Sequence, residues 1–380
     1  MRIGLIAPPW ESIPPVGYGG TEVVVDNLAR ALQARGHSVR LFTVATSTCP
    51  VRRDYLFAEP VDPMGTSVEE AAHVLAAYEE LDDVDVIHDH TILGPLLGPL
   101  SRPAVLPVVT THHGVFTAEN RRIFAQIAEH ARVVAISHSQ AAVAPELPIV
   151  AVIHHGVDLE RYRLGPGGGG YLINVSRMCP EKGIDSAIRV ARAAGRRLII
   201  ASKMREPVEF AYFQAKVEPL LGTDIELIIE PDLETRLELW SRADALVNPI
   251  SWPEPFGLVM IEALASGTPV LAMDIGAAPE IVEHGRTGFL CRDEPEMIAA
   301  LDRLVTIDRA SCRASAETRF SMDRMAQEYV EVYQAMDYPS VPSVVSAGNA
   351  SRSPTANGMI DPGRDDGNDA TLDLRRRATG

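Results

Sequence analysis

The sequence predicts an α/β protein built from two consecutive domains, each with a parallel sheet. Its 380 residues exceed the size of one typical domain and suit two of about 150–170 residues, each large enough for its own core. Short runs rich in Val, Ile and Leu alternate with amphipathic stretches of about 12–15 residues, a pattern typical of parallel α/β architecture. The Gly/Pro segment RLGPGGGG at 163–170 separates two such series and indicates a hinge.

The apolar runs give the expected strands. In the first domain, residues 1–162, they fall at 2–7, 38–44, 84–88, 105–111, 132–136 and 149–153. In the second domain, residues 163–321, they fall at 171–176, 197–201, 225–230, 244–248, 269–273 and 288–291. Ligands bind outside the carboxyl ends of strands in open parallel sheets, and the motifs described below follow such strand ends. We therefore expect a ligand cleft between the two domains.

The last part of the chain changes character twice. Residues 322–336 have the apolar spacing of a closing helix. From residue 337 to residue 380 the composition shifts to Ser, Pro, Gly, Asn and Asp, which predicts a disordered tail.

Composition restricts the classes of function. Hydrophobic residues make up 46% of the chain and the net charge is −16, which disfavours nucleic acid and anionic membranes as partners. No apolar run approaches the ~20 residues of a membrane span. Residues 1–8 resemble a first strand rather than a signal peptide, so a cytoplasmic location is expected. The four cysteines are scattered without a C-x-x-C pair, so neither a disulfide framework nor a zinc site is predicted.

Histidines gather in the first domain, which raises the question of a metal site. H-D-H at 88–90 alternates along a strand end, and the two histidines at 112–113 point to opposite faces of their strand. We therefore expect no metal site there.

The most informative stretch is WPEPFGLVMIEALASGTPV at 252–270. Glu254 ends a proline-punctuated loop, Gly257 precedes a helix, and Glu262 follows on that helix. Both carboxylates are directed to one edge of a sheet. An ionised carboxylate can accept two hydrogen bonds from a vicinal diol, so a ligand rich in hydroxyl groups is favoured. The alternative interpretation is a helix-capping glutamate and a solvated one.

Two further loops each precede a helix, one with two glycines and the other with two cations. Gly19 and Gly20 precede a helix, where small residues permit close approach of a ligand and the helix N-terminus favours negative charge. Their spacing is not G-x-G-x-x-G, and 43–46 lacks the acidic residue that holds a ribose in nicotinamide enzymes. Arg177 and Lys182 flank another strand-to-helix loop and suit a pyrophosphate. The alternative for the glycine loop is a plain tight turn, and the alternative for Arg177 and Lys182 is two solvated surface cations.

The pattern E-P-F-G-x4-E-A at 254–263 resembles the signature of the retaining nucleotide-sugar glycosyltransferases of glycosyltransferase family 4, which have the GT-B fold. The other motifs occur in the family's order: the glycine loop at 19–20, T-x-H-G at 111–114 and R-x4-K-G at 177–183. Within the family the chain looks most like the branch of the avilamycin-type antibiotic glycosyltransferases. The resemblance implies that the closing helix crosses back onto the first domain.

The resemblance also implies roles for individual residues. Arg177 and Lys182 would stabilise the leaving diphosphate, Glu262 would hold the ribose, and Glu254 would accept hydrogen bonds from the donor sugar. His113 would approach that sugar from the first domain, with His112 as the alternative register. The further residues implied in donor binding are Gly19, Gly20, Lys203, Phe256 and Gly257. Ser137 either faces the cleft or caps a helix, and His155, in H-G-V-D, is interpreted as structural.

The expected reaction moves a sugar from a nucleoside diphosphate to an acceptor hydroxyl with retention of anomeric configuration. A UDP-sugar is favoured and a GDP-sugar is the alternative, while the acceptor is unknown. No cofactor and no metal are expected, since Arg177 and Lys182 supply the counter-charge. Two other classes stay open: a sugar-nucleotide epimerase of GT-B fold, and a catalytically silent carbohydrate-binding protein.

Overall fold

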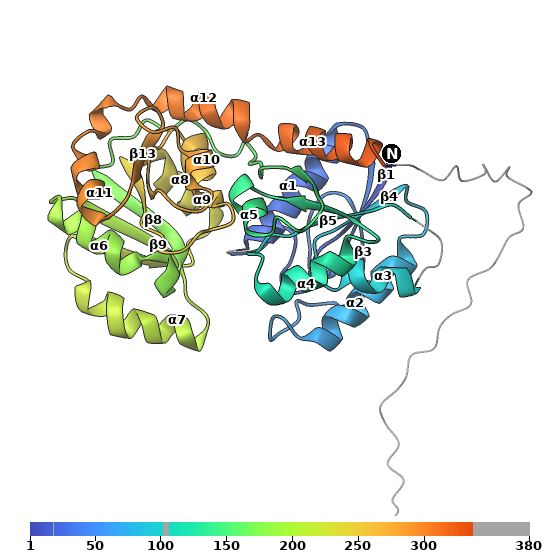
Figure 1. Ribbon diagram of the computed structural model, residues 1–380. Helices are drawn as coiled ribbons and strands as arrows, with labels where there is room; N and C mark the ends of the chain where they lie inside the picture. The colour runs from blue at the N-terminus through green and yellow to red at the C-terminus, as the bar shows by residue number, and fades with distance from the viewer. Residues whose placement is uncertain (18, 102–105, 337–380) are drawn as a thin grey trace, which may run out of the picture. The chain divides into compact units, whose positions relative to one another are not determined.

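The structure is a computed structural model that describes residues 1–17, 19–101 and 106–336 (Figure 1). Both sheets lie within one compact unit, Met1–Pro339. The tail predicted at 337–380 lies outside the described residues. None of the helices in the described ranges is long and apolar enough to cross a membrane.

The first sheet has seven parallel strands in the order β3-β2-β1-β4-β5-β6-β7. Its strands are β1 (Arg2–Ile6), β2 (Ser38–Thr43), β3 (Arg52–Tyr55), β4 (Val86–Asp89), β5 (Val108–Thr111), β6 (Arg132–Ala135) and β7 (Ile149–Val152). Six of them match the predicted strands. The edge strand β3 was not predicted, because Arg-Arg-Asp-Tyr has no apolar run, and charged residues are typical of a sheet edge that faces solvent.

The second sheet has six parallel strands in the order β10-β9-β8-β11-β12-β13. These are β8 (Tyr171–Arg177), β9 (Arg197–Lys203), β10 (Ile225–Ile229), β11 (Ala245–Asn248), β12 (Val270–Met273) and β13 (Gly288–Cys291). All six coincide with predicted strands. Most strands of both sheets are buried at nearly every position, as expected where helices cover both faces of a parallel sheet.

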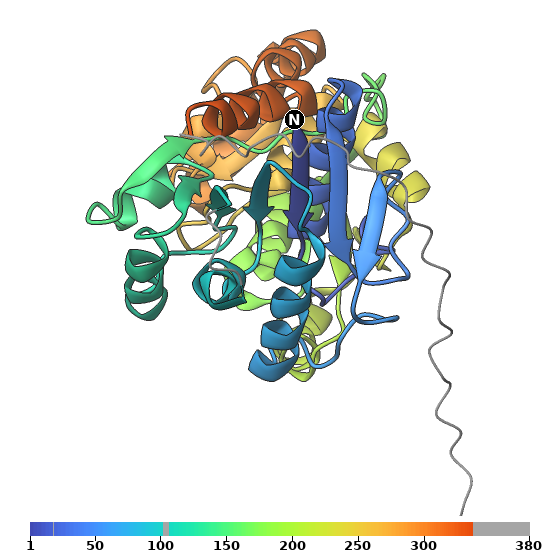
Figure 2. The same cartoon turned by 90° about the vertical axis from the view of Figure 1, so that its right-hand side faces the viewer.

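Helices cover both sheets (Figures 1 and 2). The first domain contains α1 (Gly20–Ala34), α2 (Ser67–Glu80), α3 (Gly94–Ser101), α4 (Ala118–Ile127) and α5 (His138–Val143). The second contains α6 (Ile184–Ala193), α7 (Pro207–Tyr212), α8 (Leu233–Arg242), α9 (Leu258–Ala265), α10 (Ala278–Ile281), α11 (Glu294–Leu301) and α12 (Arg309–Arg319). One 3-10 turn, η1 (Pro180–Lys182), precedes α6.

The closing helix α13 (Met322–Gln334) packs against α1 on the first domain (Figure 1). Its Met325, Tyr329 and Tyr333 are buried in the same apolar core as residues of β1 and α1. The closing helix therefore lies on the first domain.

The chain crosses between the two domains twice, at residues 156–158 and at residues 320–322. These two passages lie side by side. Val157 donates its backbone N–H to the Phe320 carbonyl at 2.8 Å and accepts a hydrogen bond from Met322 N at 3.1 Å. A Cβ on Gly156 would lie 2.5 Å from the Ser321 carbonyl oxygen. Only glycine permits this close approach, which gives the H-G-V-D motif the structural role predicted for it.

The Gly/Pro segment at 163–170 is an irregular loop, as predicted, but it is fastened to the second domain. Gly165 N donates to the Ser266 carbonyl, and Gly167 N to the Ser241 carbonyl, both at 3.0 Å. A Cβ on Gly165 would lie 2.1 Å from Ser241 O. These glycines serve close packing, so the segment predicted to be a hinge is held against the second domain.

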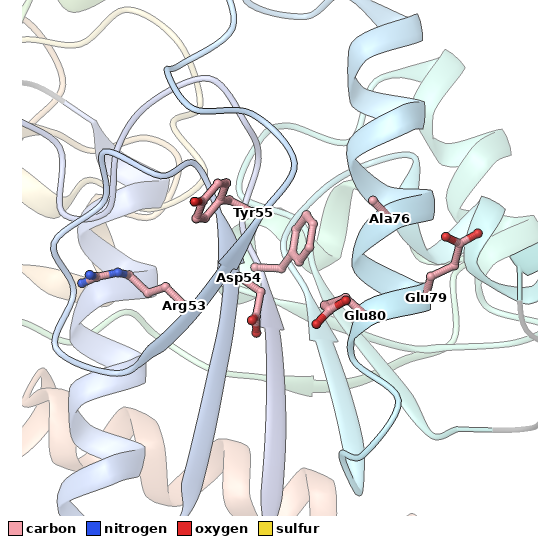
Figure 3. A pocket seen from close by; sticks show the side chains of 7 residues that line it. Arg53, Asp54, Tyr55, Ala76, Glu79 and Glu80 are labelled. Atoms are coloured by element: carbon pink, nitrogen blue, oxygen red, sulfur yellow. The ribbon is translucent and has the colours of Figure 1, made fainter. Parts of the chain in front are cut away.

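A surface cavity of about 380 Å³ opens beside the edge strand β3 of the first domain. Figure 3 shows its wall of side chains from β3 and from the end of α2. The lining includes the carboxylates of Asp54, Glu79 and Glu80 against one cation, Arg53. None of the predicted site residues lines this cavity, so it is no counterpart of the predicted donor site.

Candidate functional site

The predicted site residues follow strands at the two points where strand order reverses. In the first sheet β1 lies beside β4, and in the second β8 lies beside β11. Connections from such neighbouring strands leave in opposite directions, and the gap between them is where open α/β sheets bind ligands. The glycine loop follows β1, Arg177 ends β8, and the loop that carries Glu254 follows β11.

Arg177 and Lys203 are direct neighbours at the carboxyl edge of the second sheet. They are partners in the parallel pairing of β8 with β9, and Met178 N donates to the Lys203 carbonyl at 2.9 Å. The Arg177 side chain is 48% exposed, and its Nη1 lies 3.9 Å from Glu209 Oε1. Two cations at one strand edge, one of them accessible, suit an anionic ligand.

Lys182 is buried and forms an ion pair with Glu254. The pair joins the η1 turn after β8 to the loop after β11, so it spans the strand reversal of the second sheet. The other carboxylate oxygen, Glu254 Oε2, is buried and has no hydrogen-bond partner among the described residues. Lys182 and Glu254 thus form an ion pair in which the second carboxylate oxygen has no partner among the described residues.

Gly183 places Lys182. Its φ is +65°, and a Cβ there would lie 2.3 Å from the Pro249 carbonyl oxygen. A side chain would therefore be strained by the left-handed backbone and would also collide with the chain after β11.

The E-P-F-G segment positions Glu254 at the start of α9. Gly257 has a φ of +108° as the N-cap residue of α9, and a Cβ on it would lie 2.5 Å from Met260 Cε. Phe256 is buried, with its ring centroid 4.9 Å from that of His155. This placement gives Phe256 a packing role beneath the first interdomain passage, and a direct contact with a donor stays a prediction.

Glu262 lies on α9 and accepts a hydrogen bond from the Tyr162 hydroxyl at 2.9 Å. Burial raises the pKa of the Glu262 carboxyl, while the charge of Arg236 and the Tyr162 hydrogen bond oppose that rise. A carboxylate that burial makes costly to ionise gains from a ligand that donates hydrogen bonds to it. Tyr162 was not predicted as a site residue because a tyrosine in a loop carries no pattern.

The glycine loop meets both α1 and the second domain. A Cβ on Gly19 would lie 2.7 Å from Glu22 Oε2, and one on Gly20 would lie 3.6 Å from Leu258 Cδ1 at the start of α9. Glu22 itself is buried, and burial raises the pKa of its carboxyl. The loop therefore approaches the helix that carries Glu262.

The two histidines of T-T-H-H-G separate as predicted. His112 packs between Phe116 and Phe124. His113 instead lies against His155, with ring centroids 5.2 Å apart, and its Nε2 is 2.9 Å from His90 Nδ1. His113 is thus the member that faces the E-P-F-G side, although its contact with a sugar stays a prediction.

Ser137 accepts a hydrogen bond from Gln140 N at 2.9 Å and caps α5, so the capping alternative describes its side chain. Directly after it, the His138 and Ser139 backbone N–H groups donate to Glu280 at 2.8 and 2.7 Å. Glu280 also contacts His154 Nε2 at 2.8 Å. Glu280 therefore joins the second domain to the first, a role that no sequence pattern signalled.

The described side chains bear on the question of a metal site. They contain no group of three or more His, Cys, Asp or Glu placed to hold a metal ion.

The chain has two parallel-sheet domains, connected by two passages of the chain, and a last helix that packs on the first domain. This arrangement defines the GT-B class. Comparison with known proteins agrees. A model described as Glycosyltransferase Family 4 matches residues 18–161, and one described as Glycosyl transferases group 1 matches residues 169–306. The chain therefore belongs to the glycosyltransferases of the GT-B fold.

Relatives cover nearly the whole described chain. A glycogen synthase of Mycobacterium tuberculosis is 28% identical, over 88% of this chain and 95% of its own length. A D-inositol 3-phosphate glycosyltransferase of Rhodococcus erythropolis is 28% identical, over 83% and 86%. The crystal structure of AviGT4, a glycosyltransferase involved in avilamycin A biosynthesis, aligns with a TM-score of 0.65 and 26% identity over 88% and 97%.

Proposed function

We propose that the protein transfers a sugar from a nucleoside diphosphate to an acceptor hydroxyl, with retention of anomeric configuration. The observation that carries the proposal is the Lys182–Glu254 pair beside Arg177 and Lys203 at the strand reversal of the second sheet. It combines charge for a diphosphate with an acceptor oxygen for a sugar hydroxyl. UDP is the favoured nucleotide and GDP the alternative.

The reaction breaks the bond between the anomeric carbon and the diphosphate oxygen. Negative charge grows on the leaving diphosphate, and the cations of Arg177 and Lys182 stabilise it; such preorganised electrostatic stabilisation is usually the largest contribution to catalysis. The acceptor oxygen forms the new bond on the face that the diphosphate leaves, and the leaving phosphate takes the acceptor proton. This front-face course needs no covalent nucleophile.

The carboxylates divide the remaining contacts. Glu262, held by Tyr162, accepts hydrogen bonds from the ribose diol, and the free Oε2 of Glu254 accepts one from a hydroxyl of the transferred sugar. Glu254 is also the partner of Lys182. When the diphosphate binds, Lys182 must therefore share its charge between Glu254 and the phosphate oxygens. Sugar and diphosphate recognition are therefore coupled through one carboxylate.

The names of the relatives support a proposal for the acceptor class. Their names give a glucan and an inositol phosphate as products or acceptors, and AviGT4 belongs to antibiotic biosynthesis. We accordingly propose a small polyol or a glycan as the acceptor. A place in the avilamycin-type branch is the narrower proposal and rests on the 26% identity to AviGT4.

A thermal-shift panel of UDP-, GDP-, ADP- and dTDP-sugars tests the donor, since selective binding to the folded state raises the melting temperature. The selected donor is then incubated with glycerol, inositol and oligosaccharide acceptors, and the product anomer is read by proton NMR. An α-linked product from an α-donor supports retention. A new sugar nucleotide formed without an acceptor would instead identify an epimerase, and absence of binding to the whole panel would overturn the proposal.

A further inference from the structure

Three neighbouring imidazoles at the carboxyl edge of the first sheet have incomplete hydrogen bonding. His90 Nε2, His113 Nδ1 and His155 Nδ1 are each buried without a partner among the described residues. The ring centroids of His90 and His113, and of His113 and His155, are both 5.2 Å apart. Buried polar atoms in native proteins are nearly always satisfied, so a cluster of three such atoms points to a missing ligand group or water.

The hydrogen bond between His90 Nδ1 and His113 Nε2, 2.9 Å long, links the tautomers of the two rings. A neutral imidazole has one N–H donor and one acceptor nitrogen. If His90 donates, its Nε2 is an acceptor and His113 Nδ1 is a donor. If His113 donates, these roles are exchanged. In both cases the two outer nitrogens offer one donor and one acceptor.

Burial keeps both rings neutral, because it lowers the pKa of His90 and of His113 well below the ordinary value, and the neighbouring histidines add to the effect. A hydroxyl group both donates and accepts, whereas a phosphate oxygen only accepts and an ammonium only donates. One donor beside one acceptor on neutral rings therefore matches the hydroxyl groups of a sugar or another polyol.

We propose that His90 joins His113, the residue that the resemblance places at the donor sugar, in one hydroxyl-binding subsite, in which His90 fixes the tautomer of His113 and contacts the sugar itself. The proposal rests on the proposed function, where the ligand is the transferred sugar. Continuity with that site runs through His155, whose ring stacks on His113 and touches Phe256, two residues from Glu254. The outer nitrogens are buried in this conformation, so the proposal requires that the side chains around them, His155 among them, move aside for a ligand.

His88, the other histidine of H-D-H, shows what a satisfied ring in this region looks like. Its Nδ1 lies 2.7 Å from the Tyr333 hydroxyl and its Nε2 lies 2.9 Å from Thr111 Oγ1. Both nitrogens are used within the protein, by α13 and β5. His88 is therefore structural, whereas His90, two residues further along, retains an unused nitrogen.

Histidine side-chain NMR with ¹⁵N labelling tests the linked tautomers without any need for activity. In the wild-type protein at neutral pH, His90 and His113 should each show one neutral tautomer. In His90→Phe the His113 signals should move to exchange-averaged values. His113→Phe assigns the signals, and the exposed His130→Gln is the control that should leave them unchanged. A His113 tautomer that is the same with and without His90 would overturn the proposal.

The second measurement compares a nucleotide sugar with its bare nucleoside diphosphate by calorimetry, on folded wild-type and variant protein. His90→Phe should weaken the nucleotide sugar about threefold to tenfold, the loss of one or two neutral hydrogen bonds, and leave the diphosphate within about twofold. His90→Asn, which keeps a donor and an acceptor, should recover part of the loss. Equal weakening of both ligands, or of neither, counts against the subsite.

Failure of the proposed function has a different signature. If the wild-type protein binds no nucleoside diphosphate, the donor assignment fails on its own. The subsite is then tested with concentrated glucose and inositol, which should shift the His90 and His113 ¹⁵N signals but not those of His130. Absence of any shift with every sugar would overturn hydroxyl binding.

Discussion

The cations at the edge of the second sheet have to be stable in the folded protein and also able to contact an anionic ligand. Lys182 is buried, and an isolated buried cation is costly, so it is held as an ion pair with Glu254. Arg177 is half exposed and remains accessible to an anion. In the proposed reaction Arg177 therefore captures the diphosphate first, and Lys182 contributes when its pair with Glu254 is redistributed.

We predict that Arg177→Ala or Lys182→Met lowers turnover at least about tenfold, which is on the order of 1.4 kcal/mol of transition-state stabilisation. Methionine is chosen at 182 because it fills the space of the buried stem. Lys216→Ala, at an exposed lysine, is the control and should leave turnover unchanged. Steady-state kinetics with the selected donor checks this, and near-normal turnover in both variants would remove these residues from the mechanism.

Variants of Glu262 and Glu254 should differ in their effects, because each glutamate contacts a different half of the donor in the proposed reaction. Glu262→Gln removes the charged acceptor for the ribose, and hydrogen bonds to charged groups are worth about 1.5–3 kcal/mol, so the bare nucleoside diphosphate should bind more weakly. Glu254→Gln removes the charge that neutralises Lys182, so diphosphate binding should persist or tighten while sugar transfer falls. Calorimetry with UDP and GDP, beside turnover, measures both. Equal weakening of UDP by the two variants would contradict this division.

Some of this site follows from the sequence and some does not. Arg177, Lys182 and Glu254 could be assigned to one sheet edge because each follows a strand that an apolar run predicts. The ion pair between Lys182 and Glu254 could not, because 72 residues separate them and no local pattern relates one loop to the other. The same holds for the contact of Tyr162 with Glu262 and that of His90 with His113.

At the scale of elements, apolar runs predicted the strands that are buried on both faces and failed where burial is absent. β3 pairs with β2 at the edge of the first sheet, and three of its four residues are exposed. Its formation depends on the neighbouring strand rather than on its own composition. Helix starts were easier to locate where glycine is required, as at Gly257 with its φ of +108°.

Gly183 gives a prediction with an internal control. Gly183 and Gly195 have nearly the same backbone, with φ of +65° and +63°, but only Gly183 faces a close atom, Pro249 O, at 2.3 Å from an added Cβ. Both Gly→Ala variants lose about 1–2 kcal/mol to the left-handed conformation. Gly183→Ala should lose more stability than Gly195→Ala and should also reduce turnover, because Lys182 moves with it. Urea unfolding and kinetics measure the difference, and equal stability losses would contradict the close contact.

At the scale of the whole molecule, noncovalent contacts as well as the covalent chain join the two domains. The passages at Val157 and Ser321 pair as a bridge, α13 packs on α1, and Glu280 caps α5 from the second domain. Motion between the sheets therefore has to use the paired passages. His155 lies in the first of these passages, where burial lowers the pKa of its imidazole.

Buried histidines should make the folded protein sensitive to acid. Burial lowers the pKa of several imidazoles, to about 3 for His155 and to about 4 for His73, so the unfolded chain binds more protons below the ordinary value of 6.5. Stability is then lost as pH falls through 6.5. For His155 alone the loss between pH 7.5 and pH 5 is about 2 kcal/mol.

Buried carboxyls act in the opposite direction. Burial raises the pKa of Asp89 to about 7, and it also raises the pKa of Glu22 and Glu262. The folded state therefore holds these protons more tightly, and stability rises as pH falls through the raised value. The histidines outnumber them, since the groups with lowered pKa are His37, His73, His88, His90, His112, His113 and His155. A net loss of stability is expected.

His155→Asn isolates one contribution, because asparagine stands at this position in the N-G-V-D motif that the chain resembles and does not titrate. The wild-type protein should lose stability between pH 7.5 and pH 5, and His155→Asn should lose about 2 kcal/mol less over the same range. His130→Gln, at an exposed histidine, should follow the wild type. Urea unfolding free energies at several pH values provide the measurement. If His155→Asn and the wild type lose the same stability, His155 is not held neutral by burial, and the closed arrangement of the passage around Phe256 does not persist in solution.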